Sequence, residues 1–433
     1  MIGNGGPAHT YVGFGFGAIQ PGLLLYDAFR SRAFDRFVIA EILPSLVGAM
    51  RRADGMYTFN IAGMDGVRQV TLGPVELLDV GVPADRERLV AAIAEAHEIG
   101  TAITTFDQYV MEIPGSLHRM IAEGLRRKVA QDGSKVLVYA AENHNRAKEM
   151  LREAVMSEVP AAERDDVNAR VQFVNTVISK MCGLVTDREA ITAHDLAPMW
   201  PELIPDRALL VEDYDRLLID EVTLAGFERG IATFEEKSDL LPFKEAKLFG
   251  HNGTHAIAAY LAGFRGATRM AELRGMPDLM GFLRTAFLEE AGAALIRKYE
   301  GFDPLFTREG FADFVDNILT RMVNPYLLDT VQRVGRDPRR KLGWEDRLIG
   351  TLRLGLQYDV DTPRYAFGTA AALATLKPEV LTSDLPVWDL LTAIWVPQEP
   401  DPEAAASVVS VIEAALPKLK NWVQNGCGEI ALD

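Results

Sequence analysis

A lysine, an asparagine and two histidines lie within one short segment, KLFGHNGTH, residues 247–255. At about 100° per residue of an α-helix, His251 lies roughly 40° and His255 roughly 80° around the helix axis from Lys247. Asn252 lies roughly 140° from the lysine, so an ammonium, an amide and an imidazole share one side of the predicted helix. Groups of this kind serve in proton transfer and in binding a negatively charged oxygen.

A solvated helix face is the ordinary alternative for such a segment, but its two glycines argue against that interpretation. Each glycine inside a helix costs about 1 kcal/mol relative to alanine. Close approach of another backbone or of a ligand would explain Gly250 and Gly253 better. His251 and His255, at i and i+4, could instead bind zinc. No glutamate follows His251 as in H-E-x-x-H, and no cysteine lies nearby, so we expect no metal.

A second candidate site is a glycine turn near the start of the chain. Gly15 and Gly17 follow a short apolar run, and Pro21 suits the first position of the helical stretch that comes next. A dinucleotide fold needs glycines where the backbone approaches a pyrophosphate, a helix N-terminus for its charge, and a carboxylate about 20 residues on for the adenosine ribose. Glu41, after the second apolar run, supplies that carboxylate. It would repel the 2′-phosphate of NADP, so NAD is the favoured cofactor.

The dinucleotide motif is incomplete in this register, because Gln20 stands in place of the third glycine. An overlapping register, Gly13, Gly15 and Ala18, satisfies G-x-G-x-x-A. A glycine-rich turn without a ligand is one alternative, and a Glu41 that begins an exposed helix is another. The residues expected to contact NAD are Gly15, Phe16, Gly17, Ala18, Ile19, Glu41 and Thr105.

Two further groups of polar residues could carry chemistry. Glu142 and Asn143 follow an apolar run, and polar residues at the carboxyl end of a parallel strand face the ligand crevice. Asn143 is therefore a candidate donor to a substrate oxygen, with a helix N-cap as the alternative. The other group is a basic cluster that is either a solvated face or a site for an anionic substrate. Its members are Arg333, Arg336, Arg339, Arg340 and Lys341.

The glycine turn and Asn143 belong to a region where apolar runs alternate with helical patterns. This alternation predicts a parallel, doubly wound sheet and hence an α/β domain. The predicted strands are 10–14, 37–40, 56–61, 102–106 and 135–140, and the predicted helices are 85–99 and 116–129.

After about residue 185, apolar positions recur with a period of about 3.6 residues, which predicts helices. The predicted helical segments are 208–222, 243–264, 276–300 and 310–324, and a last one follows a Pro- and acid-rich break from Val396. We therefore expect an α/β dinucleotide-binding domain in residues 1–198 and a mainly α-helical domain in residues 199–433. The Pro-containing stretch 199–206 would connect them, and the last segment would pack on the second domain.

Composition limits the partners of the protein. The 433 residues carry 45 Lys and Arg against 61 Asp and Glu, a formal net charge of −16, so neither nucleic acid nor an anionic membrane is an expected partner. No stretch approaches the roughly 20 apolar residues that span a bilayer, and the start does not resemble a signal peptide. Two distant cysteines exclude a disulfide framework and fit a reducing cytoplasm. The sequence leaves the oligomeric state open, and a monomer is compatible with it.

These pieces together resemble the polyol-specific long-chain dehydrogenases. The resemblance is carried by residues 247–266, 289–299 and 324–349, and more loosely by 138–147, 171–179 and the glycine turn. Lys247, Asn252 and His255 match the family's K-x-x-x-x-N-x-x-H signature. Similar enzymes are metal-independent, with a Rossmann-type N-terminal domain, a mainly helical C-terminal domain and an active site between them.

The resemblance implies a role for each matching residue. Lys247 would be the general base that removes the alcohol proton, and burial beside cationic groups would lower its pKa. Asn143 and Asn252 would hydrogen-bond the developing alkoxide. The residues expected to bind the substrate are His255, Arg333, Arg336, Arg340, Lys341 and Ser179. The implied reaction is the NAD-dependent interconversion of a hexitol 1-phosphate, such as mannitol 1-phosphate, and fructose 6-phosphate.

Two departures from the family pattern bear on this expectation. Gln20 and Pro21 stand where the family usually has Gly-Arg or His-Arg, which alters the expected binding of the pyrophosphate. Ser179 stands where the family has an aspartate expected to bind substrate hydroxyls. The alternatives are a dehydrogenase of an unphosphorylated polyol, a reductase of a sugar acid and, from another class, an NADH-binding sensor that has lost catalysis. The basic cluster favours a phosphate, although it would attract a carboxylate too.

Overall fold

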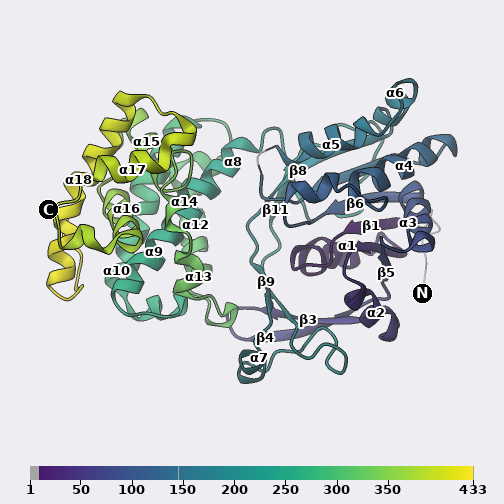
Figure 1. Cartoon of the computed structure of the whole chain (residues 1–433), viewed down its shortest axis with the longest axis horizontal. Helices are drawn as coiled ribbons and strands as arrows, with labels where there is room; N and C mark the ends of the chain where they lie inside the picture. Colours follow the sequence, from purple (N-terminus) through teal and green to yellow (C-terminus); the bar gives the residue numbers. More distant parts are fainter. Residues whose placement is uncertain (1–8, 145, 433) are drawn as a thin grey trace. The chain divides into compact units, whose positions relative to one another are not determined.

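The computed structural model describes residues 9–144 and 146–432. They divide into two units, the first ending at Leu241 and the second beginning at Pro242. Figure 1 shows strands and helices interleaved along the first unit and helices throughout the second. The expected fold class, an α/β domain followed by a mainly α-helical domain, is therefore confirmed.

The main sheet of the first unit has the strand order β12-β11-β8-β7-β6-β1-β2-β5. The strands from β8 to β5 are parallel, whereas β11 pairs with β8 in the antiparallel direction. The order β5-β2-β1-β6-β7-β8 is that of a Rossmann-type sheet. The strand bounds are Thr10–Phe14 (β1), Arg36–Glu41 (β2), Glu76–Asp79 (β5), Ala96–Thr101 (β6), Val136–Ala140 (β7), Val171–Ile178 (β8), Leu217–Asp220 (β11) and Glu235–Lys237 (β12).

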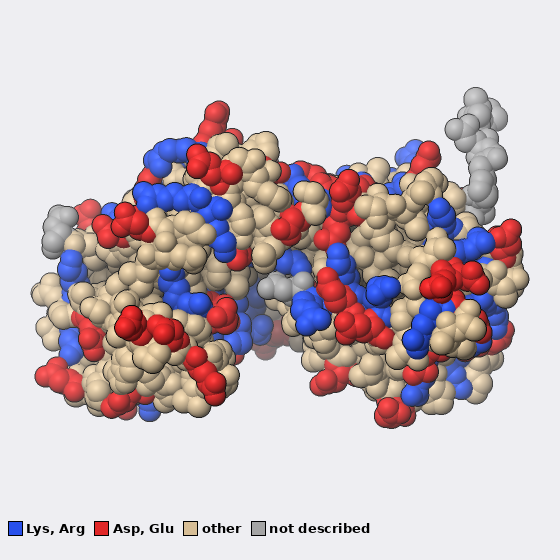
Figure 2. Space-filling view, turned by 90° about the horizontal axis from the view of Figure 1, so that it is seen from above, with Lys and Arg blue, Asp and Glu red and all other residues tan. Residues whose placement is uncertain are grey.

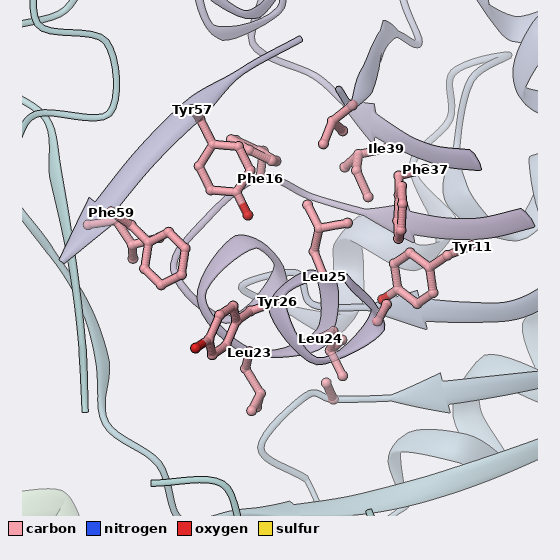
Figure 3. Packing of buried hydrophobic residues seen from close by; sticks show 14 of the residues in the cluster. Tyr11, Phe16, Leu23, Leu24, Leu25, Tyr26, Phe37, Ile39, Tyr57 and Phe59 are labelled. Atoms are coloured by element: carbon pink, nitrogen blue, oxygen red, sulfur yellow. The ribbon is translucent and has the colours of Figure 1, made fainter. Parts of the chain in front are cut away.

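Both faces of this sheet are covered, which is why its parallel strands are apolar runs. Every residue of β1 and β7 is buried. On one face, the strands pack with α3 (Pro83–Glu95), α4 (Leu117–Ala130) and α5 (Ala147–Ser157). On the other face, β1 and β2 pack against η1 (Gln20–Leu24), α1 (Leu25–Ser31) and β3 (Tyr57–Ala62), as Figure 3 shows for Tyr11, Leu24, Ile39, Tyr57 and Phe59.

A second sheet of the first unit has the order β4-β3-β10-β9. Its strands are Tyr57–Ala62 (β3), Val67–Leu72 (β4), Cys182–Val185 (β9) and Ala208–Glu212 (β10). The strand predicted at 56–61 thus forms, but it lies outside the parallel sheet. The helix predicted over 208–222 is wrong, because this segment forms β10 and β11. Two short apolar runs separated by five polar or aromatic residues can imitate a helical period, and every residue of β10 is buried.

The prediction was also wrong around β6. The helix expected over 85–99 ends at Glu95, and the strand expected over 102–106 instead occupies Ala96–Thr101. Polar residues within β6, such as His97 and Glu98, interrupt the apolar run, so the sequence pattern does not indicate a strand there. Buried Glu98 accepts hydrogen bonds from the Tyr139 hydroxyl at 2.9 Å and from the backbone N–H groups of Gly230 and Ile231, which satisfy its carboxylate inside the protein.

The connection expected at 199–206 lies inside the first unit. Met199 and Trp200 are buried in the same apolar cluster as β3 and β10. Because β10, β11 and β12 complete the two sheets, the first unit extends to Leu241 rather than to residue 198. The boundary expected between 198 and 199 is corrected accordingly.

The second unit consists of helices joined by short turns. Fully buried residues of α9 pack against α16 and α13, and α18 packs on α16 and α17, as expected for the last segment. The helices are α8 (Leu241–Glu245), η4 (Ala246–Asn252), α9 (Gly253–Phe264), α10 (Pro277–Thr285), η6 (Ala286–Gly292), α11 (Ala293–Lys298), α12 (Arg308–Met322), α13 (Val331–Gly335), α14 (Pro338–Lys341), α15 (Ile349–Gln357), α16 (Pro363–Leu376), α17 (Val387–Trp395) and α18 (Pro402–Gln424).

The surface mixes charges of both signs. On the face drawn in Figure 2, Lys and Arg side chains are interspersed with Asp and Glu. Ion pairs such as Arg36 with Glu76 and Glu95, both at 2.8 Å, engage basic side chains locally. Among the residues that the structure describes, none of the helices combines the length and apolar character needed to cross a bilayer.

Candidate active site

A cavity of about 300 Å³ lies in the first unit where β1, β2 and β6 end. This is the carboxyl edge of the parallel sheet, where Rossmann-type folds bind their ligands. The glycine turn, Glu41 and the chain after β6 all border it. The lining residues are Phe14, Gly15, Phe16, Gly17, Ala40, Glu41, Ile42, Leu43, Leu46, Val80, Ala102, Ile103, Thr104, Gln108, Met111, Ile113, Gly115, Ser116, Leu117 and Arg207.

Only glycine suits the first position of the glycine turn. Gly15 has φ +82°, and a Cβ at this position would lie 2.8 Å from the carbonyl oxygen of Ala102. Gly17 faces open space instead, with no atom within 4 Å of where its Cβ would be. The backbone of the turn is therefore accessible to a ligand. Of the other residues expected to contact NAD, Ala18 and Ile19 lie outside the cavity lining, and Thr104 borders the cavity in place of Thr105.

Glu41 is buried at the end of β2, so the alternative in which it begins an exposed helix is wrong. Its Oε2 accepts a hydrogen bond from the N–H of Phe16 at 2.7 Å, and its Oε1 accepts from Ile42 at 2.7 Å and Leu43 at 3.0 Å. A carboxylate accepts about four hydrogen bonds. One acceptor position on Oε2 thus remains for a ribose hydroxyl. The bond from Phe16 fixes the glycine turn to the end of β2, and the bonds from Ile42 and Leu43 hold the chain directly after the strand.

Gln20, one of the departures from the family pattern, lies inside the core. It is fully buried, and its Nε2 donates a hydrogen bond to the hydroxyl of Tyr11 at 2.8 Å. The amide of Gln20 occupies the space where a Cβ on Gly13 would be. Gly13 is therefore required by packing under the turn, and Gln20 does not line the cavity.

Arg207, which the sequence analysis did not single out, lines the same cavity. It precedes β10, and its Nη2 donates a hydrogen bond to the carbonyl of Phe16 at 3.2 Å. Burial lowers the pKa of Arg207, an effect that the Glu41 carboxylate opposes. No sequence pattern pointed to it, because residues 199–206 before it were taken for an interdomain connection.

Glu142 and Asn143 follow β7 but differ in their surroundings. Glu142 is buried and accepts hydrogen bonds from Thr101 Oγ1 at 2.9 Å, the N–H of Ile103 at 3.1 Å and the hydroxyl of Tyr109. Burial raises its pKa. Asn143 is exposed at the same edge of the sheet, and it is not a helix cap, since α5 begins at Ala147. Its amide is thus open to a ligand.

Ser179 directly follows β8 at the carboxyl edge and is half-buried. Lys180, next to it, is buried and lies 3.8 Å from Oδ1 of Asp215. The chain beyond β8 therefore carries the hydroxyl of Ser179 where the family resemblance implied a carboxylate. The neighbouring Lys180 lies close to Asp215.

The lysine-bearing segment of the second unit is a π-helix, η4. The N–H of Gly253 donates to the carbonyl of Leu248, five residues earlier. In this geometry residues five apart lie on adjacent turns, so Lys247 and Asn252 share one side of the helix. The α-helical angle of 140° expected between them is wrong for this reason.

The two glycines of this segment make room for side chains of neighbouring helices. A Cβ on Gly250 would overlap the ring of Phe287, and one on Gly253 would lie 2.9 Å from the Tyr365 hydroxyl oxygen. That hydroxyl donates to the carbonyl of Phe249 at 2.6 Å and lies 3.2 Å from the carbonyl of Gly250. Gly250 therefore serves helix packing, whereas the expected close approach of another backbone is found at Gly253, where a Cβ would lie 3.2 Å from the carbonyl oxygen of Arg347. Tyr365 holds η4 in place.

Lys247 lies in a desolvated and positively charged environment. Burial, together with Arg347 and Lys244, lowers its pKa to about 8. Burial also lowers the pKa of His251, with His255 and Arg321 contributing. The amine of Lys247 thus loses its proton far more readily than that of an exposed lysine.

His255 belongs to a chain of charged groups. Its Nε2 lies 3.5 Å from Oδ2 of Asp329, a buried carboxylate whose Oδ1 accepts a hydrogen bond from Nε of Arg333 at 2.6 Å. Burial alone would raise the pKa of Asp329, but His255 and Arg333 together bring it below its usual value. Asp329 therefore lies beside His255 and forms an ion pair with Arg333.

The basic cluster does not form one uniform face. Lys341 is buried and donates to the carbonyls of Val334, at 2.7 Å, and Arg336. Arg340 is paired with Asp337 at 3.1 Å and with Asp346 at 2.9 Å. Arg336 is exposed and forms no ion pair within the described part of the chain. It is thus the member of the cluster most available to an anion.

Arg347 is a further charged residue that the sequence analysis did not identify. Its Nε pairs with Oδ1 of Asp346 at 2.7 Å, and its charge lowers the pKa of Lys247, His251 and Lys341. It lies within the segment 324–349 that carried the family resemblance. Arg347 lies six residues beyond Lys341, the last member of the basic cluster, so the cluster did not point to it.

Removal of metal is expected to leave activity intact. The rings of His251 and His255 stack at 5.9 Å with an interplanar angle of 21°. No group of three or more His, Cys, Asp or Glu side chains able to hold a metal occurs among the described residues. Activity is measured after exhaustive treatment with a strong chelator, with and without added Zn²⁺. Loss of activity that Zn²⁺ restores would contradict this expectation.

Two family models match the chain. Residues 9–222 match the Mannitol dehydrogenase Rossmann domain, and residues 239–424 match the Mannitol dehydrogenase C-terminal domain. With the cavity of the first unit and the half-buried lysine of the second, these matches define a polyol dehydrogenase, an oxidoreductase acting on CH–OH groups. The chain belongs to the mannitol dehydrogenase family. The Rossmann domain agrees with NAD as the cofactor.

Solved structures share this fold at low sequence identity. The ternary complex of Pseudomonas fluorescens mannitol 2-dehydrogenase with NAD and D-mannitol is 17% identical with a TM-score of 0.69, over 97% of this chain and 94% of that chain. A D-sorbitol dehydrogenase in substrate-free form is 16% identical with a TM-score of 0.74, over 95% of this chain and 94% of that chain.

Proposed function

We propose that this chain interconverts a hexitol 1-phosphate, such as mannitol 1-phosphate, and the corresponding ketose phosphate, fructose 6-phosphate, with Lys247 as the general base. The observation that carries the catalytic part is the half-buried lysine on η4, with Asn252 on the same side of the helix and with its lowered pKa. A base of this kind suits proton transfer near neutral pH.

In the oxidation, the neutral amine of Lys247 takes the proton of the substrate hydroxyl while the carbon bearing it loses a hydride and becomes a carbonyl. NAD, when bound, supplies the acceptor for that hydride. The amide of Asn252 donates a hydrogen bond to the developing negative oxygen. His255, held by Asp329, orients a neighbouring hydroxyl. In the reduction of the ketose, the protonated lysine returns the proton.

The charge of the second unit supports a phosphorylated substrate. Arg333 and Lys341 are engaged by Asp329 and by backbone carbonyls, which leaves Arg336 exposed and without an ion pair in the described chain. A bound phosphate would gain charge-assisted hydrogen bonds from Arg336.

An unphosphorylated polyol is the second candidate. The similar solved structures, a mannitol 2-dehydrogenase and a D-sorbitol dehydrogenase, favour it. A sugar acid would be attracted by the same arginines, and an NADH-binding sensor would keep the cavity without turnover.

Oxidation of NADH with fructose 6-phosphate, fructose and a hexuronate separates these functions. We expect fructose 6-phosphate to have the highest kcat/KM. We also expect Arg336→Ala to raise its KM about tenfold with little change in kcat, as loss of a charged hydrogen bond predicts. Arg339→Ala is the matched control, because Arg339 is an exposed neighbour whose Nη2 contacts the carbonyl of Ala393 at 3.4 Å.

Each other outcome of this experiment identifies an alternative. Equal or better use of fructose would favour an unphosphorylated polyol, and preference for the hexuronate would favour a sugar acid. Binding of NADH without turnover of any of the three would favour the sensor.

A further inference from the structure

Arg207 brings a positive charge into the cavity of the first unit. Its guanidinium is hydrogen-bonded to the carbonyl of Phe16, the middle residue of the glycine turn. The N–H of the same residue is bonded to Glu41. Arg207 and Glu41 thus flank Phe16, and both border the cavity.

Most of the hydrogen-bonding capacity of Arg207 is unused. Arginine carries five N–H donors. Its Nε is shielded from solvent and has no hydrogen-bond partner among the residues described. Nor does the guanidinium form an ion pair with any carboxylate in residues 9–144 or 146–432, since the nearby Glu41 directs its oxygens to three backbone N–H groups.

The guanidinium of Arg207 is half-buried, and a partly desolvated charge without a paired anion is unfavourable. The rest of the cavity lining is largely apolar or backbone, so the positive charge of Arg207 is not balanced by a directly bonded acid. A phosphate group matches the planar fork of N–H donors of an arginine and would offset this cost.

We propose that Arg207 binds a phosphate group of the dinucleotide that occupies this cavity. In a Rossmann-type fold the diphosphate crosses the glycine turn, and a 2′-phosphate would lie beside the carboxylate at the end of β2. Both places border Phe16, so the shared chemistry is a phosphate ester recognised by a guanidinium. The inference concerns the cofactor and does not depend on which polyol is the substrate.

Equilibrium binding of three nucleotides to the full-length protein, without any polyol, tests this proposal. The ligands are adenosine, ADP-ribose and ADP-ribose 2′-phosphate, measured by calorimetry for the unmodified protein, Arg207→Ala and Arg207→Lys. For a diphosphate contact, Arg207→Ala weakens both phosphorylated ligands by the same factor, about ten- to a hundredfold, and leaves adenosine unchanged. Arg207→Lys retains the charge and loses less affinity.

A contact with the 2′-phosphate gives a different pattern, in which only ADP-ribose 2′-phosphate loses affinity. The matched control is Arg126→Ala, which removes an arginine of the same unit that pairs with Glu163 at 2.6 Å and should change no affinity. Unchanged binding of all three ligands to Arg207→Ala would overturn the proposal. An equal loss for adenosine and the phosphorylated ligands would also overturn it, because it would show a general change of the cavity.

Discussion

Lys247→Ala is expected to lower turnover by about 10²- to 10⁴-fold, the usual contribution of a positioned general base. The affinity for NADH should stay the same, because the nucleotide cavity is built from residues of the first unit and Lys247 belongs to the second. Steady-state kinetics of polyol oxidation and calorimetric titration with NADH measure the two quantities separately.

The pH dependence of the unmodified protein provides a second test of Lys247 as the general base. The base form of Lys247 is the neutral amine, and its pKa of about 8 means that polyol oxidation rises with pH through about 8 and then levels off. Ketose reduction needs the protonated form and should fall over the same range. Lys247→Arg is the control, because a guanidinium keeps the positive charge but does not release its proton. Near-normal turnover in Lys247→Ala or Lys247→Arg would exclude Lys247 as the base.

The unmodified protein is expected to prefer NAD over NADP by at least about a hundredfold in kcat/KM. The carboxylate of Glu41 borders the cavity and would face the dianionic 2′-phosphate of NADP, and each 1.4 kcal/mol of repulsion corresponds to about tenfold. Glu41→Ser should narrow this ratio by weakening NAD binding and relieving the repulsion. Kinetics with both cofactors measure the change.

Glu41→Ser also removes the acceptors for three backbone N–H groups, so a second variant is needed to separate charge from structure. Glu41→Gln keeps one oxygen acceptor for Phe16 or for Ile42 and Leu43 while it removes the charge. It should narrow the cofactor ratio while losing less thermal stability than Glu41→Ser. If the unmodified protein used both cofactors equally, or if neither variant changed the ratio, Glu41 would not be the residue that discriminates between them.

Much of this fold was predictable because its determinants are local. The runs that form β1, β2 and β7 are buried on both faces, and such strands must be apolar along their whole length. The strand β6 was displaced in the prediction because Glu98 is satisfied by Tyr139 and by the distant backbone of residues 230–231, which no local pattern contains. The segment 208–222 was read as a helix because its two strands find their partners far away in the chain.

In the candidate site, too, the features set by local sequence were predictable and those set by tertiary structure were not. The spacing of Lys247, Asn252 and His255 was visible in the sequence, as was the acidic residue at the end of β2. Arg207 and Arg347 were not visible, since each reaches its site through tertiary structure rather than through a motif. The angular relation between Lys247 and Asn252 was wrong, because π-helical hydrogen bonding depends on how Phe287 and Tyr365 pack against the segment.

The π-helical turn at Ala246–Asn252 also sets how the chain tolerates changes in length. Relative to an α-helix, such a turn is equivalent to one inserted residue. A single deletion there would restore ordinary α-helical geometry without disturbing the apolar pattern of α9. It would nevertheless rotate Lys247 by about 100° relative to everything that follows, including His255. The number of residues in this segment is therefore itself part of the site.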